Sequence, residues 1–149
     1  IKLGYKHVWT PSLGSVDLYK TKIDDKTLNQ TILNVINVLE QNGDSYVDDF
    51  IIDINPYAFK FVNKSGLFDL VDGYVLSYRE HKIKPYKAIY NVLLERYNLI
   101  PNESVFIDDN KNNIETGNSM GIISKKVEPD DYYSIIKIIK EFNLIQGEI

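Results

Sequence analysis

Short apolar runs alternate along this chain with longer segments that have the periodicity of helices. The runs are rich in β-branched residues, and polar groups gather where they end, which is typical of parallel strands buried on both faces. The predicted strands are Phe50–Asn55, Tyr74–Leu76, Val105–Ile107 and Ile122–Ile123, and the predicted helices are Lys26–Glu40, Tyr57–Lys64, Pro85–Tyr97, one from about Asn112, and one after Asp130. This alternation predicts right-handed βαβ units. The expected fold class is α/β, with a parallel sheet between two layers of helices.

Two residues mark expected helix starts. Pro85 suits the first position of a helix, where the missing N–H is not needed for hydrogen bonding. Asp130 is placed to cap the last helix with its side-chain oxygen.

Length and charge limit the class of protein. The 149 residues fit one domain, and the net charge of −4 gives no general attraction to nucleic-acid phosphates. No stretch approaches the roughly 18 apolar residues of a membrane-spanning helix, and Ile1–Thr10 lacks the layout of a secretory signal. The absence of cysteine is compatible with a reducing compartment. We therefore expect a single domain over residues 1–149, located in the cytoplasm, that binds neither nucleic acid nor membrane.

Polar residues at the carboxyl ends of the predicted strands are the candidates for chemistry, because ligands of such sheets bind beyond those ends. Asp108 and Asp109 follow a buried strand directly, and paired carboxylates suit a hard cation such as Mg²⁺. The alternative is a polar turn with a helix cap. Lys84 precedes Pro85 and could hold a phosphoryl group, although such lysines are more often solvated. Asp53-Ile54-Asn55-Pro56 ends another strand, or is an ordinary strand-to-turn junction.

Taken together and in order, these segments resemble one known family. The matching segments are Asp53-Ile54-Asn55-Pro56-Tyr57-Ala58-Phe59, Gly66-Leu67-Phe68-Asp69 with Ser77-Tyr78, Lys84-Pro85 with Ile89-Tyr90, and Phe106-Ile107-Asp108-Asp109 with Asn113 and Gly121. From about Asp48 to Phe142 the chain is similar to the second half of haloacid-dehalogenase-type (HAD) phosphatases. The resemblance implies a Rossmann-like, three-layer α/β/α fold with little or no cap domain.

The resemblance also implies roles for individual residues. Lys84 matches the lysine that contacts the phosphoryl group, and Asp108 and Asp109 match the metal-binding acidic pair, with Asp109 as the direct ligand. Asp53, Asn55 and Asn113 would line the phosphate or substrate site together with Lys84. The expected cofactor is Mg²⁺ and the expected substrate is a small phosphorylated molecule, hydrolysed through an aspartyl-phosphate.

Two departures from the family pattern weigh against activity. Ile52 stands where the family has a phosphate-binding Ser or Thr, and it cannot donate that hydrogen bond. The first motif, an apolar strand ending in Asp-x-Asp, is absent between Ile1 and Gly43. Either the catalytic strand lies upstream of Ile1, or Tyr5–Trp9 is the first strand with its acids lost. The second is preferred, because losing a central strand would expose two sheet edges.

Two other functions remain open at this point. A noncatalytic pseudophosphatase that serves as a binding or regulatory module is supported by Ile52 and by the absent Asp-x-Asp. A receiver domain of the response-regulator type also uses paired acids and a lysine on a parallel sheet. It fits less well, since its acidic pair precedes the phospho-acceptor and its lysine follows it.

Overall fold

The computed structural model describes residues 6–9, 25–41, 49–52, 56–129 and 131–147. Within these ranges a five-stranded, wholly parallel sheet has the strand order β3-β2-β1-β4-β5. The strands are β1 (Lys6–Trp9), β2 (Asp49–Ile52), β3 (Gly73–Leu76), β4 (Ser104–Asp108) and β5 (Ile123–Lys126). The expected α/β class with a parallel sheet is thereby confirmed.

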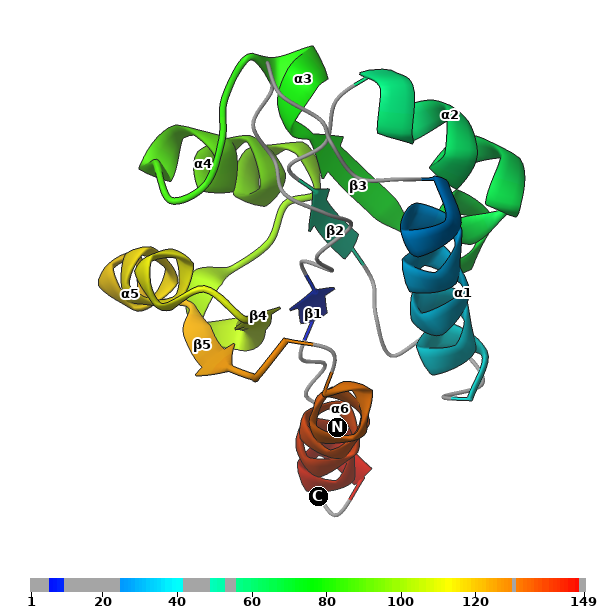
Figure 1. Ribbon diagram of the computed structural model, residues 1–149. Helices are drawn as coiled ribbons and strands as arrows, with labels where there is room; N and C mark the ends of the chain where they lie inside the picture. Colours follow the sequence, from blue (N-terminus) through cyan, green and yellow to red (C-terminus); the bar gives the residue numbers. More distant parts are fainter. Residues whose placement is uncertain (1–5, 10–24, 42–48, 53–55, 130, 148–149) are drawn as a thin grey trace.

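Helices cover both faces of this sheet (Figure 1). The longer helices are α1 (Asp25–Gln41), α2 (Pro56–Ser65), α4 (Lys87–Arg96), α5 (Lys111–Ser119) and α6 (Tyr132–Gly147). The shorter turns are α3 (Ser77–Glu80), η1 (Leu67–Leu70) and η2 (Pro101–Glu103). Helices α4 and α5 lie on one face, and α1, α2 and α6 lie on the other. This is the three-layer, Rossmann-like arrangement that the sequence predicted.

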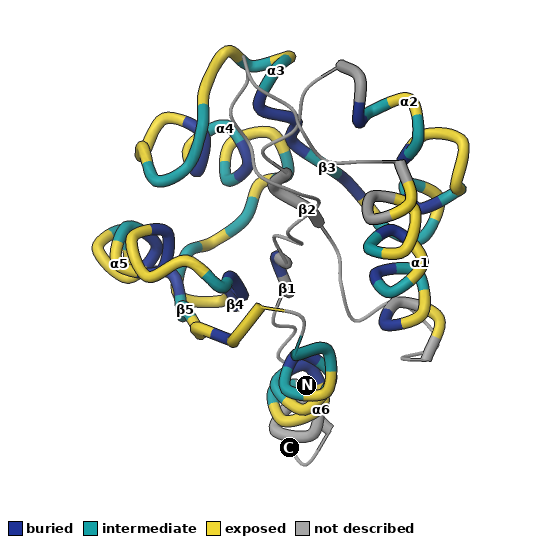
Figure 2. Tube along the Cα trace, viewed as in Figure 1, coloured by how far each residue is buried: buried dark blue, intermediate teal, exposed yellow. Residues whose placement is uncertain are grey.

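Strand β4 shows how the sequence builds two cores from one sheet. All five of its residues are buried, as Figure 2 shows for the strand and for the inner sides of the helices. Side chains alternate between the faces of a strand. Val105 and Ile107 therefore join the apolar cluster under α1, α2 and α6, whereas Phe106 joins the cluster under α4 and α5. The polar side chains of β4 lie at its two ends, with Ser104 first and Asp108 last, and Asp109 follows directly.

The structure corrects two predicted boundaries. Pro85 is not the first helical residue: it lies in a turn in which the Tyr86 N–H donates to the Ile83 carbonyl at 3.1 Å, and α4 begins only at Lys87. Strand β5 runs from Ile123 to Lys126 rather than over Ile122–Ile123.

The cap of the last helix is Asp131. Its carboxylate accepts hydrogen bonds from the Ser134 backbone N–H at 3.1 Å and from the Ser134 hydroxyl at 2.7 Å, in the first turn of α6. The predicted cap, Asp130, lies outside the described residues. Two adjacent aspartates are equally plausible caps in a sequence, and only the backbone geometry selects one of them.

Strand β1 is the central strand of the sheet. It pairs with β2 on one side and with β4 on the other, with Trp9 opposite Ile107. This is the place that the preferred interpretation of Tyr5–Trp9 gives to the first strand. The strand order also argues against a receiver domain, because receivers have the order 2-1-3-4-5 rather than 3-2-1-4-5.

Candidate functional site

The strand order places a candidate site between β1 and β4. The chain proceeds from β1 to β2 and β3 on one side, then crosses back to β4 on the other side of β1. Ligands of open parallel sheets bind at such a switch point, outside the carboxyl ends of the strands. Strand β4 ends there with Asp108, one residue beyond the pairing of Ile107 with Trp9.

Asp108 accepts hydrogen bonds from Asn110, Asn113 and Lys84. Its Oδ1 accepts from the Asn110 backbone N–H at 2.7 Å. Its Oδ2 accepts from the Asn113 amide at 3.1 Å and from Lys84 Nζ at 3.1 Å. Since the Asp108 side chain is only 2% exposed, these bonds replace the water that its charge would otherwise need. The carboxylate is therefore fixed in position.

Lys84 reaches this carboxylate from the loop between α3 and α4. Its side chain is 7% exposed, so the ion pair with Asp108 is almost fully buried. The prediction that this amine and the acidic pair meet at one rim of the sheet is confirmed. The alternative of a solvated lysine is wrong, because the Lys84 side chain is both buried and paired.

Asp109 lies beside this ion pair and has a different environment. Burial raises the pKa of Asp109 above its ordinary value, and the charge of Asp108 and a hydrogen bond between the two carboxyl groups raise it further. The Lys84 ammonium partly lowers the same pKa. A carboxylate that is costly to keep charged gains from a nearby cation. The surroundings of Asp109 thus disfavour its charged form.

The segment from Asp108 to Asn110 is both a helix cap and a part of the candidate site. The Asn110 side chain accepts from the backbone N–H groups of Asn112 at 2.8 Å and Asn113 at 3.3 Å, which caps α5. The Asp-Asp-Asn segment therefore caps α5, and it also contains Asp108, which pairs with Lys84. The cap orients the first turn of α5, from which Asn113 reaches Asp108.

Other predicted site residues lie elsewhere or cannot be placed. Asp53 and Asn55 lie outside the described residues. Ile52 is the last residue of β2, where the family pattern has a hydroxyl. In the sequence, β1 is followed by Thr10-Pro11-Ser12, which contains no carboxylate.

The protein side chains alone do not complete the coordination of Mg²⁺. Water or phosphate oxygens would supply the other ligands. Within the described part of the chain, no three His, Cys, Asp or Glu residues are grouped so that they could hold a metal ion. Two adjacent carboxylates do occur, and Mg²⁺ is commonly bound by one or two carboxylates with waters and phosphate oxygens as the other ligands. The residues present therefore fit Mg²⁺ together with a phosphoryl group better than a cation bound by protein alone.

Sequence reasoning did not single out the residues that support this site. Tyr90 is fully buried and its hydroxyl donates to the Asn113 carbonyl at 2.8 Å. The Thr116 hydroxyl donates to the Pro85 carbonyl at 2.8 Å. Tyr90 belonged to the family resemblance, but nothing in the sequence pointed to its partner. Thr116 carried no signal, because a threonine within a helix has no pattern of its own.

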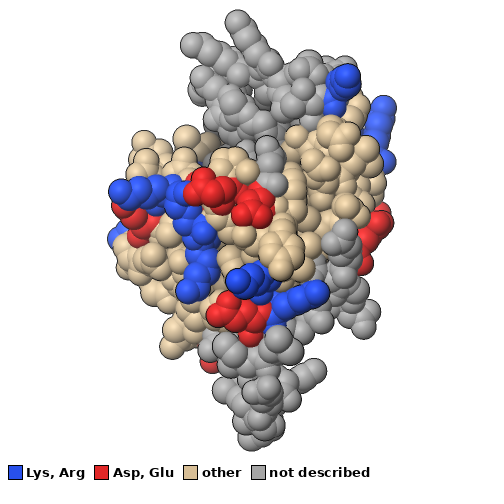
Figure 3. Space-filling view, turned by 60° about the horizontal axis from the view of Figure 1, so that its bottom comes forward, with Lys and Arg blue, Asp and Glu red and all other residues tan. Residues whose placement is uncertain are grey.

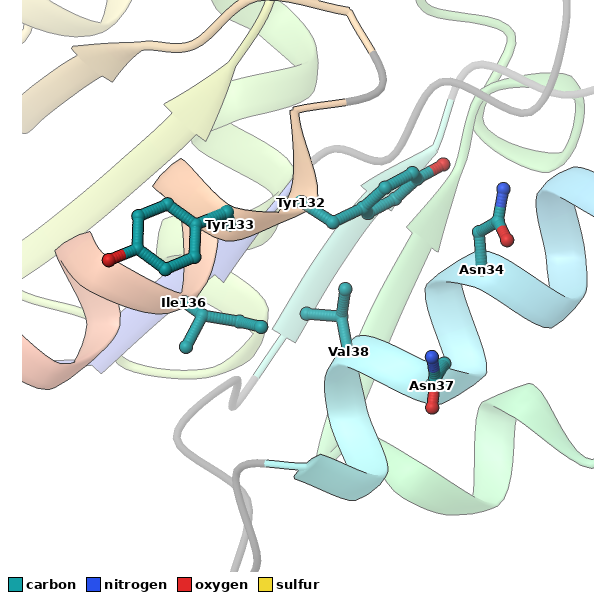
Figure 4. A pocket seen from close by; sticks show the side chains of 6 residues that line it. All are labelled: Asn34, Asn37, Val38, Tyr132, Tyr133 and Ile136. Carbon is teal, nitrogen blue, oxygen red and sulfur yellow. The ribbon is translucent and has the colours of Figure 1, made fainter.

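A separate hollow of about 220 Å³ lies between α1 and α6. Its lining residues are Asn34, Asn37, Val38, Tyr132, Tyr133 and Ile136 (Figure 4). These helices cover the face of the sheet opposite α4 and α5, so the hollow contains none of the predicted site residues. On the face shown in Figure 3, basic and acidic side chains of the described residues are interspersed and form no large patch of one sign. None of the helices in the described ranges is long and apolar enough to cross a bilayer.

The fold and the site define a Rossmann-like α/β protein with a buried lysine and an acidic pair at its switch point. The family model described as haloacid dehalogenase-like hydrolase matches residues 35–121. This chain therefore belongs to the haloacid dehalogenase-like hydrolase family. A search of curated proteins found no match.

Solved structures share this fold at low sequence identity. A predicted HAD-like family hydrolase from Porphyromonas gingivalis is 14% identical, with a TM-score of 0.67 over 93% of this chain and 98% of that one. A HAD family enzyme from Bacteroides thetaiotaomicron, in complex with magnesium and inorganic phosphate, is 15% identical, with a TM-score of 0.65 over 89% and 99%. A HAD phosphatase from Thermococcus onnurineus is 21% identical, with a TM-score of 0.54 over 73% and 56%.

Proposed function

We propose that this chain is a phosphatase-type member of its family, which binds Mg²⁺ and the phosphoryl group of a small phosphorylated molecule where β1 and β4 end. The observation that carries the proposal is the buried contact between Lys84 Nζ and Asp108 Oδ2, with Asp109 beside it. A buried lysine at a switch point supplies positive charge where anionic ligands of this fold class bind. The Bacteroides thetaiotaomicron structure with magnesium and phosphate supports the choice of ligands.

Each residue of the cluster has a separate task in this proposal. Asp109 is the direct Mg²⁺ ligand, because Asp108 already accepts hydrogen bonds from Lys84, Asn113 and the Asn110 backbone. Asp108 holds the Lys84 amine, and Asn113 holds Asp108. An ammonium group has three N–H donors, so a lysine can contact a carboxylate and a phosphoryl oxygen together. When bound, Mg²⁺ would neutralise negative charge on the phosphoryl group.

A second candidate function, binding without hydrolysis, is favoured by one specific observation. The central strand β1 is followed by Thr10-Pro11-Ser12, whereas hydrolysis through an aspartyl-phosphate needs a carboxylate there. The same candidate fits Ile52, the last residue of β2, because the family pattern has a hydroxyl at this position and isoleucine has none. A protein of this kind would recognise a phosphorylated molecule and report its presence to a partner.

Calorimetry on the whole chain tests the binding shared by both candidates. We expect Mg²⁺ to bind, and inorganic phosphate to bind more tightly when Mg²⁺ is present. Asp109→Asn should weaken Mg²⁺ binding by about tenfold or more. Asp72→Asn is the matched control. The exposed Asp72 immediately precedes β3, so it lies at the amino ends of the parallel strands, whereas the candidate site lies at their carboxyl ends. Equal Mg²⁺ affinity in wild type and Asp109→Asn would remove the proposed ligand.

Hydrolysis of a generic aryl phosphate separates the two candidates. Turnover by the wild-type chain that is lost in Asp109→Asn supports the phosphatase. Binding without turnover supports the noncatalytic module. In that case the double variant Thr10→Asp/Ser12→Asp tests whether the acids are the missing part, since it restores the Asp-x-Asp spacing after β1. The cytoplasmic location and the single domain over residues 1–149 stay predictions.

A further inference from the structure

Two hydrogen bonds connect the Lys84 segment to α5 in opposite directions. From α4, the Tyr90 hydroxyl donates to the Asn113 carbonyl in the first turn of α5, at 2.8 Å. From α5, the Thr116 hydroxyl donates to the Pro85 carbonyl, also at 2.8 Å. Tyr90 and Asn113 are 23 positions apart in the sequence, and Thr116 and Pro85 are 31 positions apart. Both bonds therefore fix tertiary structure rather than a local turn.

Each bond ends on a backbone group next to the candidate site. Asn113 is the residue whose side-chain amide donates to Asp108 Oδ2. Pro85 directly follows Lys84, whose amine donates to the same Oδ2. The two bonds thus hold the backbone segments that carry two side-chain donors of one carboxylate oxygen. A shift of either backbone would change the distance between Lys84 and the acidic pair.

The surroundings of Tyr90 add a third connection. Its ring meets the Phe106 ring edge-on, with centroids 5.3 Å apart. Phe106 lies in β4, two residues before Asp108. The buried Tyr90 side chain therefore contacts the strand that carries the acid and the helix that orients it. Apolar packing alone would place the ring, whereas the hydroxyl adds a directional contact with the Asn113 carbonyl.

We propose that Tyr90 and Thr116 are positioning residues, which set the distance between Lys84 and the Asp108–Asp109 pair and thereby the affinity of the site for phosphate. This inference rests on the proposed function for its ligand. Neither residue contacts the ligand in the proposal. They act through the Asn113 and Pro85 backbones, much as outer residues orient the direct ligands of metal sites.

Variants that remove one hydroxyl each can test this. Tyr90→Phe keeps the ring, and Thr116→Val keeps the shape of the side chain, whereas Thr116→Ser keeps the donor. We expect Tyr90→Phe and Thr116→Val to weaken binding of inorganic phosphate, measured by calorimetry with Mg²⁺ present, about three- to tenfold. Thr116→Ser should stay within about twofold of wild type. Ser119→Ala is the control on the same helix, because it removes a hydroxyl that donates to the Thr116 carbonyl within α5, at 2.7 Å.

A measurement without ligand separates failure of this inference from failure of the proposed function. Proton exchange of the Lys84 ammonium, followed by NMR in the free protein, reports how firmly the amine is held. Exchange that is several times faster in Thr116→Val and Tyr90→Phe, and restored in Thr116→Ser, supports the positioning role even if phosphate does not bind. Unchanged exchange in both variants overturns it, whatever happens to their stability.

Discussion

Lys84 Nζ and Asp108 Oδ2 lie 3.1 Å apart, and their side chains are 7% and 2% exposed. The lysine stands in a loop before α4 and the aspartate at the end of β4, so the pair joins two segments 24 residues apart. A buried pair of this kind contributes little net stability relative to an apolar pair, but either charge left alone is costly. The pair therefore makes the site sensitive to the loss of a single partner.

The first prediction concerns the loss of Lys84. Lys84→Met should lower the free energy of unfolding by about 3–5 kcal/mol, because it leaves the Asp108 charge buried without its cation. The double variant Lys84→Met/Asp108→Asn should recover part of this loss, since Asp108 then carries no charge that needs a partner. Urea unfolding of the wild type, both single variants and the double variant measures the coupling between the two residues.

An exposed ion pair provides the control for that experiment. Lys111 and Glu115 approach to 3.8 Å on α5, with side chains 78% and 62% exposed. Because water solvates these charges, Lys111→Met should change the free energy of unfolding by no more than about 0.5 kcal/mol. Additive effects of the Lys84 and Asp108 substitutions would contradict the first prediction.

The sequence could predict where Asp108 lies, but its local pattern could not predict that Lys84 contacts Asp108. Asp108 could be predicted at the edge of the sheet because the apolar run before it has the pattern of a buried strand. The local pattern could not predict that Lys84 reaches it, because a loop lysine has the same appearance whether it is solvated or buried. Only the family resemblance connected the two residues, through the order of the motifs.

The boundaries of the elements and the residues that support the site were harder to predict from the sequence, for physical reasons. Pro85 is compatible with a helix start, yet the turn at Ile83–Tyr86 and the use of the Pro85 carbonyl by Thr116 delay α4 to Lys87. The short α3 and η1 elements contain four residues each, too few to show helical periodicity. Supporting hydrogen bonds such as Tyr90 to Asn113 depend on packing between helices, which no local pattern encodes.

The second prediction is a pH dependence that comes from Asp109. Its pKa is raised by burial and by Asp108, so the folded protein binds a proton there more readily than the unfolded chain. The stability that it contributes is fully present below its unfolded pKa and is lost as pH rises through the raised folded pKa. Relative to Asp109→Asn, the metal-free wild type should therefore lose stability as pH rises through this window. Urea unfolding at several pH values measures the difference.

Asp131 provides a control of opposite sign. Hydrogen bonds from the Ser134 side chain and backbone lower the pKa of Asp131. Its contribution is present above the unfolded pKa and is lost as pH falls through the lowered one, so the difference from Asp131→Asn should have the reverse slope. The same slope for both variants would show that a global effect of pH, rather than Asp109, is being measured.

The third prediction concerns the cap of α5. Asn110→Ala should lower the free energy of unfolding by about 1 kcal/mol, because the backbone N–H groups of Asn112 and Asn113 lose their acceptor. Asn110→Asp keeps an acceptor oxygen and should be close to wild type. The cap also orients Asn113 toward Asp108, so Asn110→Ala should weaken Mg²⁺-dependent phosphate binding by calorimetry, while Asn110→Asp should not. Equal stability of the two variants would contradict the role of the cap.

The fourth prediction tests the contact of α5 with the sheet at Gly117. This glycine is buried, and a Cβ there would collide with the Ser124 hydroxyl and lie 3.1 Å from the Phe106 ring. Alanine favours a helix more than glycine does, by about 1 kcal/mol, but overpacking typically costs about 1–3 kcal/mol. Because the neighbours are a β5 side chain and a core ring, we expect the steric cost to exceed the gain in helix propensity. Gly117→Ala should thus lower the urea midpoint.

Removing the obstructing atom should reverse part of that loss. In Gly117→Ala/Ser124→Ala the nearest clash is absent, so the double variant should be more stable than the sum of the two single effects. Gly121→Ala is the matched control: its φ of +81° makes alanine strained, but a Cβ there meets only Pro101, at 3.8 Å. Its loss of about 1–2 kcal/mol should be unaffected by Ser124→Ala. If Ser124→Ala rescued both glycine variants equally, it would be acting as a general stabiliser, and the close packing of α5 on β5 would not be the cause.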